Sequence, residues 1–512
     1  MLQIEHTKNK LIAKNTLFLY CRMLFIMFVT LFTSRILLKS LGVVDYGLNN
    51  VVGGLIVIFS YINASMSSAT SRFITYELGK GKDSNLGRIF SGSLSIHLSL
   101  AIFVLVLGEV VGVLLVNNVL NIPQNRILAC NILYQTVVIS AFFTITQVPF
   151  NSTIIAYERM SVYAYIGIYD AITKLLIAYV VMKTRYDKLI VLAVLQLFAS
   201  TSIWAFYVYY TWYHFRRIVS FRVLFDRELV LSMGAFTFWS LIGSTANMLK
   251  NQGVNVLINL FFGSIVNAAN AIAYQVNHAV FNFSSNFMMA MNPQIVKSYA
   301  GKNFEQFKKL VFRGGKFSFF LLTLLCYPLL FETKSVLALW LGTYPSYTVL
   351  MTQLVLVLTM VESFTYSIGY AVQATGRIRN YQLVISGVTL MNFPISLLLF
   401  YLDFPPYTAL AVSIIISSIT LMMRMYFIDV LLNISPTEYS MYVFKPTFLV
   451  LLLTMPIPII IVNIVEEGIF RFVILTLSVI LFNSLIIFAI GMNTEERNSV
   501  LRFVRKKIVS NS

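Results

Sequence analysis

Apolar stretches of about twenty residues recur along almost the whole chain, and they constrain its fold more than any other feature. A helix needs roughly 20 apolar residues to cross the hydrocarbon core of a bilayer. Because 58% of the 512 residues are apolar and only 11% are charged, the chain cannot cover its apolar surface in water. The sequence therefore predicts an all-α integral membrane protein of about 14 transmembrane helices, at 15–38, 48–70, 89–116, 127–152, 162–182, 189–213, 229–261, 268–291, 314–331, 348–373, 382–401, 406–428, 446–464 and 470–491.

The net charge of +18 is explained by membrane topology. If the N-terminus is cytoplasmic, most Lys and Arg residues fall in segments on the cytoplasmic side, as the positive-inside rule requires. We therefore expect both termini in the cytoplasm. The basic start MLQIEHTKNKLIAK precedes an apolar run that is too long for a signal peptide, which indicates an uncleaved first helix. The basic excess also suits anionic lipid headgroups, so nucleic acid is not an expected partner.

The two halves of the chain resemble each other at a nearly constant offset. Asp45 and Asn267 each stand at the entry to a span, and Gly79 and Gly301 follow them with the same separation of 222 residues. Six spans in each copy give both copies one orientation in the membrane. The repeat predicts an N-terminal six-helix lobe at 1–220, a parallel copy of it at 225–432, and two extra helices with a basic cytoplasmic tail at 433–512.

Motifs for catalysis or for ATP binding do not occur in the sequence. It has no phosphate-binding loop of the GxxxxGK[ST] type, no HExxH motif, and no cluster of Cys and His with metal-ligand spacing. We therefore expect no catalytic residues, no metal and no cofactor. Transport by such a chain would be driven by an ion gradient or by the gradient of the substrate itself.

Charged residues within spans are costly, and they usually face a cavity or a partner. The cations that we single out are Arg22, Arg35, Lys174 and Lys250, and the acids are Glu109, Asp170 and Glu362. Some have plainer explanations: Arg35 can reach the outer interface, and Asp170 and Lys174 stand four residues apart and can neutralise each other. Asp170 and Glu362 are also candidates for binding a coupling ion.

Amide side chains mark one face of the span at 229–261. Asn247, Asn251 and Asn255 recur every four residues, a spacing that places them on one side of an α-helix. The equivalent positions of the first span include Thr30 and Ser34. Such a stripe can serve hydrogen bonding between helices, or it can line a wet cavity that binds a hydroxyl-rich substrate.

The sequence resembles the polysaccharide-type flippases of the multidrug/oligosaccharidyl-lipid/polysaccharide exporter (MOP) superfamily, which include the O-antigen and lipopolysaccharide-biosynthesis flippases of bacteria. The stretches that carry the resemblance are SRILLKSLGVVDYGLNNVV (34–52), SSATSRFITYELGKGK (67–82), IIAYERM (154–160), FFGSIVNAANAIAYQV (261–276) and AVQATGRIRNY (371–381). The resemblance implies a MATE-like, V-shaped pair of six-helix lobes in the bacterial inner membrane. It also implies that basic residues in the cavity bind pyrophosphate, a role that Arg22, Arg35, Lys174 and Lys250 fit by residue type.

These observations favour a flippase that moves undecaprenyl-pyrophosphate-linked oligosaccharide from the cytoplasmic to the periplasmic leaflet by alternating access. Thr30, Ser34, Asn247, Asn251 and Asn255 would contact the sugar. Membrane lipids and a polysaccharide polymerase or assembly machinery are the further expected partners. A cation-coupled multidrug exporter of the same superfamily is the alternative. A membrane glycosyltransferase or polymerase is less favoured, because no long outer loop exists to carry acid–base residues.

Overall fold

The computed structural model describes residues 2–54, 57–81, 85–114, 117, 122–216, 218–219, 226–498 and 500–501. Within these ranges every regular element is a helix, and no strand occurs. The all-α class expected from the sequence is therefore confirmed. The chain divides into two compact units. The N-terminal unit comprises Ala13–Leu241 with Val296–Lys302, and the C-terminal unit comprises Met1–Ile12, Ile242–Ile295 and Asn303–Ser512.

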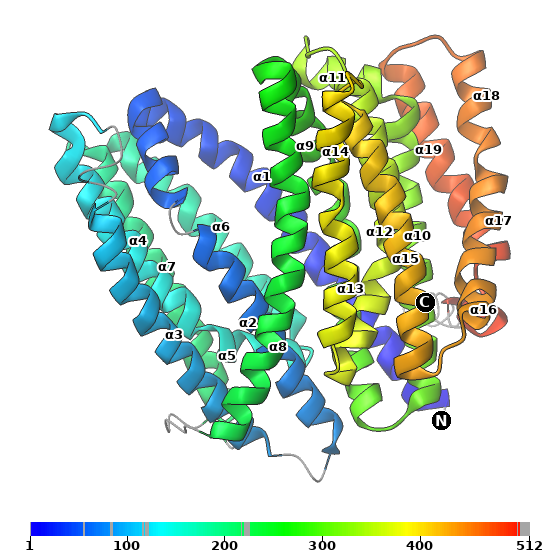
Figure 1. Ribbon diagram of the computed structural model, residues 1–512, viewed down its shortest axis with the longest axis horizontal. Coiled ribbons are helices and arrows are strands. Elements are labelled where there is room, and N and C mark those ends of the chain that lie inside the picture. Colours follow the sequence, from blue (N-terminus) through cyan, green and yellow to red (C-terminus); the bar gives the residue numbers. More distant parts are fainter. Residues whose placement is uncertain are drawn as a thin grey trace, which may run out of the picture. The chain divides into compact units, whose positions relative to one another are not determined.

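The N-terminal unit is a bundle of long helices (Figure 1). Its elements are α1 (Leu2–Gly54) from Ala13 onward, α2 (Val57–Gly79), α3 (Leu86–Leu114), α4 (Ile127–Thr146), α5 (Val148–Ala156), α6 (Met160–Lys183), α7 (Lys188–His214) and the first part of α8 (Arg227–Met248). Helix α4 packs against α3 and α7, α6 packs against α7, and α2 packs against α5. Leu133, Tyr134 and Leu189 form part of the core that joins α4 to α7.

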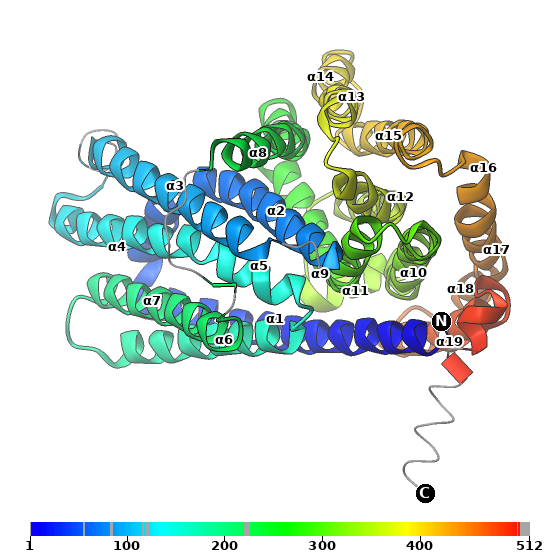
Figure 2. The same cartoon turned by 90° about the horizontal axis from the view of Figure 1, so that it is seen from below.

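The C-terminal unit continues the chain with a second bundle. Its elements are the π turn Leu249–Gly253, α9 (Val254–Ala300), α10 (Phe304–Phe331), α11 (Thr333–Leu341), α12 (Thr348–Thr375), α13 (Arg379–Leu390), α14 (Asn392–Tyr401), α15 (Thr408–Leu432), α16 (Pro436–Tyr439), the π turn Ser440–Phe444, α17 (Lys445–Thr454), α18 (Pro456–Ile464), α19 (Ile469–Ile486) and the π turn Ile487–Gly491. Helix α12 packs against α10 and α15, and α13 and α14 pack against α15. The last helices, α17 to α19, pack against α10 (Figure 2).

Proline explains why some spans consist of two helices in succession. Pro149 stands in the first turn of α5, directly after α4, and Pro456 opens α18 directly after α17. Proline lacks the backbone N–H and clashes with the preceding turn, so it bends a helix without ending the span. Each of these helix pairs still belongs to one segment that is long and apolar enough to cross a membrane, Gln124–Ala156 and Pro436–Ile464.

The described residues contain 12 helices that are long and apolar enough to cross a membrane. Twelve of the expected spans correspond to these helices, and the expected total of fourteen is not confirmed. The segment 268–291 is helical within α9, but its many Asn, Gln and Ser residues lower its apolar character. The segment 48–70 is helical where it is described, and residues 55–56 of it lie outside the described residues.

Two glycines bend long helices at related places in the sequence. Gly42 interrupts α1 with φ 76°, and Gly263 interrupts α9 with φ 78°. Their ψ angles are 170° and −177°, and a positive φ with ψ near 180° is essentially restricted to glycine, because a Cβ would clash with the backbone. Both breaks stand at the entry to the second span of each proposed copy. The division into lobes at 1–220 and 225–432 and a tail region at 433–512 stays a prediction.

The helices expose large apolar side chains at positions where a soluble bundle would be polar. Phe198 on α7 is 68% exposed, and Leu477 on α19 is 63% exposed. Many more exposed Leu, Ile, Val and Phe side chains lie along the same long helices. Such apolar surfaces are stable in contact with lipid hydrocarbon. Polar groups inside a bundle of this kind are costly, and they therefore indicate candidate functional positions.

Candidate functional site

A polar cavity of about 520 Å³ lies inside the N-terminal unit. Helix α6 contributes Tyr163, Gly167, Asp170 and Lys174, whose spacing of four, three and four residues places them on one helical face. Helices α4 and α7 contribute hydroxyl and amide groups with similar spacing. The lining residues from these and neighbouring helices include Arg22, Thr136, Ser140, Thr144, Gln147, Asn151, Gln196, Ser200 and Tyr207.

Arg22 of α1 supplies the cation of this cavity. Its guanidinium carbon lies 4.4 Å from the centroid of the Tyr163 ring, a cation–π contact. Gly167 makes room for it, because a Cβ at that position would overlap with Nε of Arg22. No carboxylate among the described residues lies within ion-pair distance of Arg22. Its positive charge is therefore held by an aromatic face and remains available to an anion.

Two buried polar atoms of cavity-lining residues have no hydrogen-bond partner in the part of the chain that the structure describes. They are Nε of Arg22, a donor, and Oδ1 of Asn151, an acceptor. Buried polar groups in folded proteins are nearly always hydrogen-bonded to protein or to ordered water. The unpaired donor can bind an anionic group of a ligand, and the unpaired acceptor can bind a hydroxyl group. The cavity therefore suits a ligand that carries both kinds of group.

The other charges of the cavity neutralise each other. Nζ of Lys174 lies 2.8 Å from Oδ2 of Asp170, one turn away on α6. The spacing of four residues allowed this pairing as the plainer explanation of the two charges, beside pyrophosphate binding by Lys174 and ion coupling by Asp170. The Lys174 side chain is 57% exposed, so the pair contributes little to stability. Since the pair is neutral overall, Arg22 gives the cavity a net positive charge.

The remaining predicted residues of α1 do not line this cavity. Thr30 and Arg35 are exposed, and Ser34 is half-buried. Arg35 is separated from Arg22 by 13 residues of helix, which turns the two side chains well away from each other. The structure therefore brings together Arg22, Asp170 and Lys174 of the predicted set, and it leaves Thr30, Ser34 and Arg35 elsewhere on α1.

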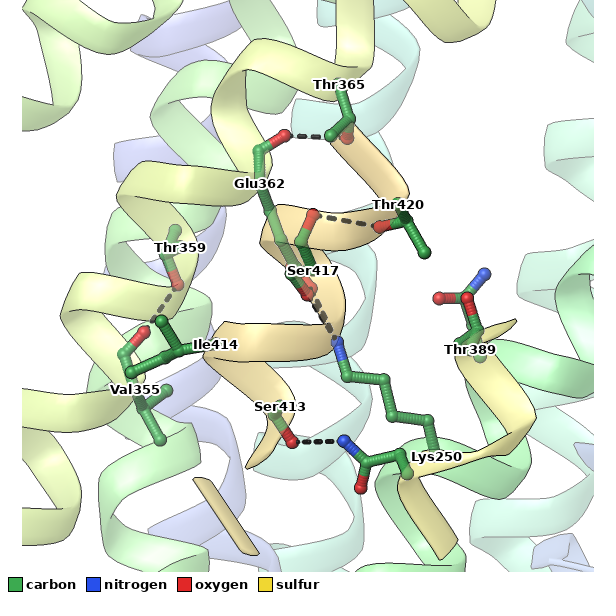
Figure 3. A network of polar contacts seen from close by, with 12 residues as sticks. Lys250, Val355, Thr359, Glu362, Thr365, Thr389, Ser413, Ile414, Ser417 and Thr420 are labelled. Carbon is green, nitrogen blue, oxygen red and sulfur yellow. Dashed lines mark hydrogen bonds and ion pairs between the residues drawn. The ribbon is translucent and has the colours of Figure 1, made fainter. Parts of the chain in front are cut away.

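In the C-terminal unit, the buried Lys250 forms an ion pair with a partly buried carboxylate (Figure 3). Its Nζ lies 2.6 Å from Oε1 of Glu362 on α12 and 3.3 Å from Oγ of Ser417 on α15. Ser417 also donates a hydrogen bond of 3.1 Å to Glu362. Only 5% of Lys250 is exposed. Whereas Arg22 has no acidic partner among the described residues, Lys250 is paired with a carboxylate and a hydroxyl from residues far from it in the sequence.

The asparagine stripe is broken up by local backbone geometry. Residues Leu249–Gly253 form a π turn, which holds an extra residue, so a spacing of four no longer keeps side chains in one line. Asn247 donates to the carbonyl of Gly243, and Oδ1 of Asn255 accepts from Asn270 at 3.2 Å. Asn251 is exposed. Two of the three amides thus serve hydrogen bonds within their own bundle.

Sequence reasoning missed several polar groups inside the spans. The hydroxyl face of α4 at Thr136, Ser140 and Thr144 has the four-residue spacing that could have revealed it. Three more cations, Lys316, Arg424 and Arg471, also lie in expected spans, and each has a protein partner in the described residues. Among the described residues no three His, Cys, Asp or Glu side chains gather as a metal site.

Comparison with known proteins identifies solved structures that share this fold. No family model matches the sequence, and no curated protein matches it. Solved structures do. A multidrug resistance MATE family transporter of the MOP superfamily, in an outward-facing conformation, covers 83% of this chain and 97% of its own at 11% identity and a TM-score of 0.67. A MATE structure in complex with MaD3S gives the same coverage at 12% identity and a TM-score of 0.68.

A third similar structure is a MOP superfamily transporter from Pyrococcus furiosus, for which reverse polarity of the binding pocket suggests a different function. It covers 81% of this chain and 95% of its own at 12% identity and a TM-score of 0.63. At these identities the likeness concerns the fold. The chain is an all-helical, multi-pass membrane protein. Its fold is the MATE-like fold of the MOP superfamily.

Proposed function

We propose that this chain is a flippase that moves undecaprenyl-pyrophosphate-linked oligosaccharide from the cytoplasmic to the periplasmic leaflet of a bacterial inner membrane. Alternating access would expose the headgroup first to one side and then to the other, while the lipid tail stays in the bilayer. The protein would act as a transporter without catalytic residues. An inside-negative potential favours outward movement of an anion by about 2.3 kcal/mol per charge per 100 mV.

The observation that supports this proposal most is that Arg22 lines the cavity without an acidic partner among the described residues. A cation at membrane depth is costly unless it is paired or hydrated, and Arg22 has no carboxylate partner among the described residues. It lines a cavity whose other groups are mainly hydroxyls and amides. A pyrophosphate would supply the missing charge through charge-assisted hydrogen bonds. The hydroxyl and amide groups, with Oδ1 of Asn151 unpaired, suit a sugar.

A cation-coupled multidrug exporter is the second candidate. It is favoured by the likeness of the fold to a multidrug resistance MATE transporter. A cavity for cationic drugs would need a free carboxylate, and Asp170 is the acid that this cavity contains. Its pairing with Lys174 at 2.8 Å leaves no net negative charge to attract such a drug. The charge of the cavity therefore favours an anionic substrate.

Competition binding to the purified protein separates these two functions. The probes are undecaprenyl pyrophosphate carrying a short oligosaccharide and the cationic dye ethidium, each measured alone and against the other. We expect the lipid-linked sugar to bind and ethidium to compete poorly. Arg22→Ala should weaken binding of the lipid by about ten- to hundredfold, because a hydrogen bond to a charged group contributes about 1.5–3 kcal/mol.

The matched control is Lys39→Ala, which removes an exposed cation from the same helix and should leave binding unchanged. Arg22→Lys should retain part of the affinity, because it keeps the charge but loses the planar, bidentate geometry. Tight ethidium binding that is abolished by Asp170→Asn and unaffected by Arg22→Ala would instead establish the drug exporter.

A further inference from the structure

The ion pair of Lys250 has the geometry of an occupied cation site. The ammonium nitrogen lies between two oxygen atoms, Oε1 of Glu362 at 2.6 Å and Oγ of Ser417 at 3.3 Å (Figure 3). These oxygens come from α12 and α15, and the ammonium comes from the π turn before α9. A carboxylate and a hydroxyl directed at one point are ligands that hard cations prefer.

The backbone around Lys250 is shaped to deliver the ammonium to this point. The π turn Leu249–Gly253 is an irregularity that often marks a functional position in a helix. Gly253 in the same turn lets α14 come close, because a Cβ there would lie 2.7 Å from the ring of Phe393. Asn392, beside Phe393, is fully buried and donates to Oγ of Ser413 on α15 at 2.7 Å. The turn that carries Lys250 is thus packed closely against α14, which is itself hydrogen-bonded to α15.

We infer that Lys250 is a tethered cation, which permanently fills a monovalent-cation site formed by Glu362 and Ser417. The side chain of Lys250 is 6% exposed and that of Glu362 is 32% exposed. Without Lys250, the partly buried carboxylate would carry an uncompensated charge in a helix that is apolar enough to span a membrane, where a cation or a proton is needed to offset it. Lys250 provides that cation from within the chain, and no ion from solution is required at this place.

The neighbours of Glu362 strengthen this assignment. Glu362 interacts electrostatically with the phenols of Tyr274 on α9 and Tyr366 on α12, and Tyr366 also interacts with Arg424 of α15. Neither phenol can supply a positive charge. Among the described residues no other Lys, Arg or His lies within ion-pair distance of Glu362, so the carboxylate loses its compensating charge when Lys250 is removed. The vacated oxygen ligands should then attract Na⁺ from the solution.

The consequence for transport rests on the proposed function. If Lys250 holds the cation site permanently, transport of an anionic substrate needs no Na⁺ at Glu362, and the free cation Arg22 of the N-terminal unit remains the residue that meets the substrate. The two cations singled out at the start of the two repeat copies would then have different tasks. The cation site itself can be tested without any substrate, so its failure is distinct from failure of the flippase proposal.

The test is the melting temperature of the full-length protein in detergent, titrated with NaCl against choline chloride at constant ionic strength. The wild type should melt at one temperature in both salts. Lys250→Ala should melt at a lower temperature in choline chloride and recover saturably as Na⁺ replaces choline. The double variant with Glu362→Gln should show no response to Na⁺. Lys250→Met, which keeps most of the apolar stem, is the second variant if Lys250→Ala does not fold.

Lys316→Ala is the matched control in the same unit. Its Nζ pairs with Glu496 at 2.6 Å, and both side chains are 5% exposed, but Arg313 lies 3.5 Å from the same carboxylate. Its removal should therefore lower the melting temperature without creating a response to Na⁺. The inference is overturned if Lys250→Ala and Lys250→Met recover only with acid and not with Na⁺, or if the wild type already responds saturably to Na⁺ through Glu362.

Discussion

Replacing Gly167 by alanine should weaken substrate binding without unfolding the protein. The new Cβ would overlap with Nε of Arg22 and lie 3.0 Å from Cδ and from Cζ of that residue. The backbone of α6 is fixed by packing, so the flexible arginine must move away from the Tyr163 ring, 4.4 Å from its guanidinium carbon. Loss of a cation–π contact costs about 0.5–2 kcal/mol, which corresponds to about a two- to thirtyfold rise in the dissociation constant.

The assay is equilibrium binding of the oligosaccharide-bearing undecaprenyl pyrophosphate to Gly167→Ala and to a matched control, Gly234→Ala. Gly234 lies in α8 of the same unit, and a Cβ there would meet no atom within 4 Å. The control should bind as the wild type does, and it should gain slight helix stability. Wild-type affinity of Gly167→Ala would refute the reasoning, because the position of Arg22 would then not govern binding.

Two further predictions concern stability and topology. Arg471→Met should destabilise the C-terminal unit by about 3–5 kcal/mol, because Glu332, which is 1% exposed, would be left as an unpaired buried carboxylate. The melting temperature of the protein should fall. Adding Glu332→Leu to the same chain should restore much of the lost melting temperature. Reporter fusions after residue 220 and after Ser512 should both show cytoplasmic activity; a periplasmic signal at residue 220 would be incompatible with six spans before that point.

The sequence predicted those features that depend on residues close together in the chain. Apolar runs of sufficient length identified the twelve spans that the described residues contain, because hydropathy and helix length are local properties. The pair Asp170–Lys174 could be foreseen as one alternative for the same reason, since residues four apart on a helix are neighbours. The total of fourteen spans was not confirmed, because the second part of α9 is helical but rich in polar side chains, and because residues 55–56 of the segment 48–70 lie outside the described residues.

Features that depend on packing could not be predicted in this way. Lys250 and Glu362 are separated by 112 residues, and no local pattern indicates that α12 would bring a carboxylate to this lysine. The predicted alignment of Asn247, Asn251 and Asn255 on one face requires an uninterrupted α-helix. The π turn at Leu249–Gly253 interrupts the helix and breaks that alignment. The unpaired state of Arg22 likewise depends on which side chains α6 and α7 place around it.

The central claim is that this chain moves an anionic, sugar-bearing lipid across a bilayer. The direct test uses vesicles that contain the purified protein and a trace of undecaprenyl pyrophosphate carrying an oligosaccharide, and measures over time how much of the sugar becomes accessible to a membrane-impermeant glycosidase outside. The account predicts that the wild type exposes the sugar initially protected on the inner leaflet, that Arg22→Ala does so much more slowly, and that ethidium is not transported. A protected fraction that stays the same as in protein-free vesicles, with ethidium transported instead, would contradict it.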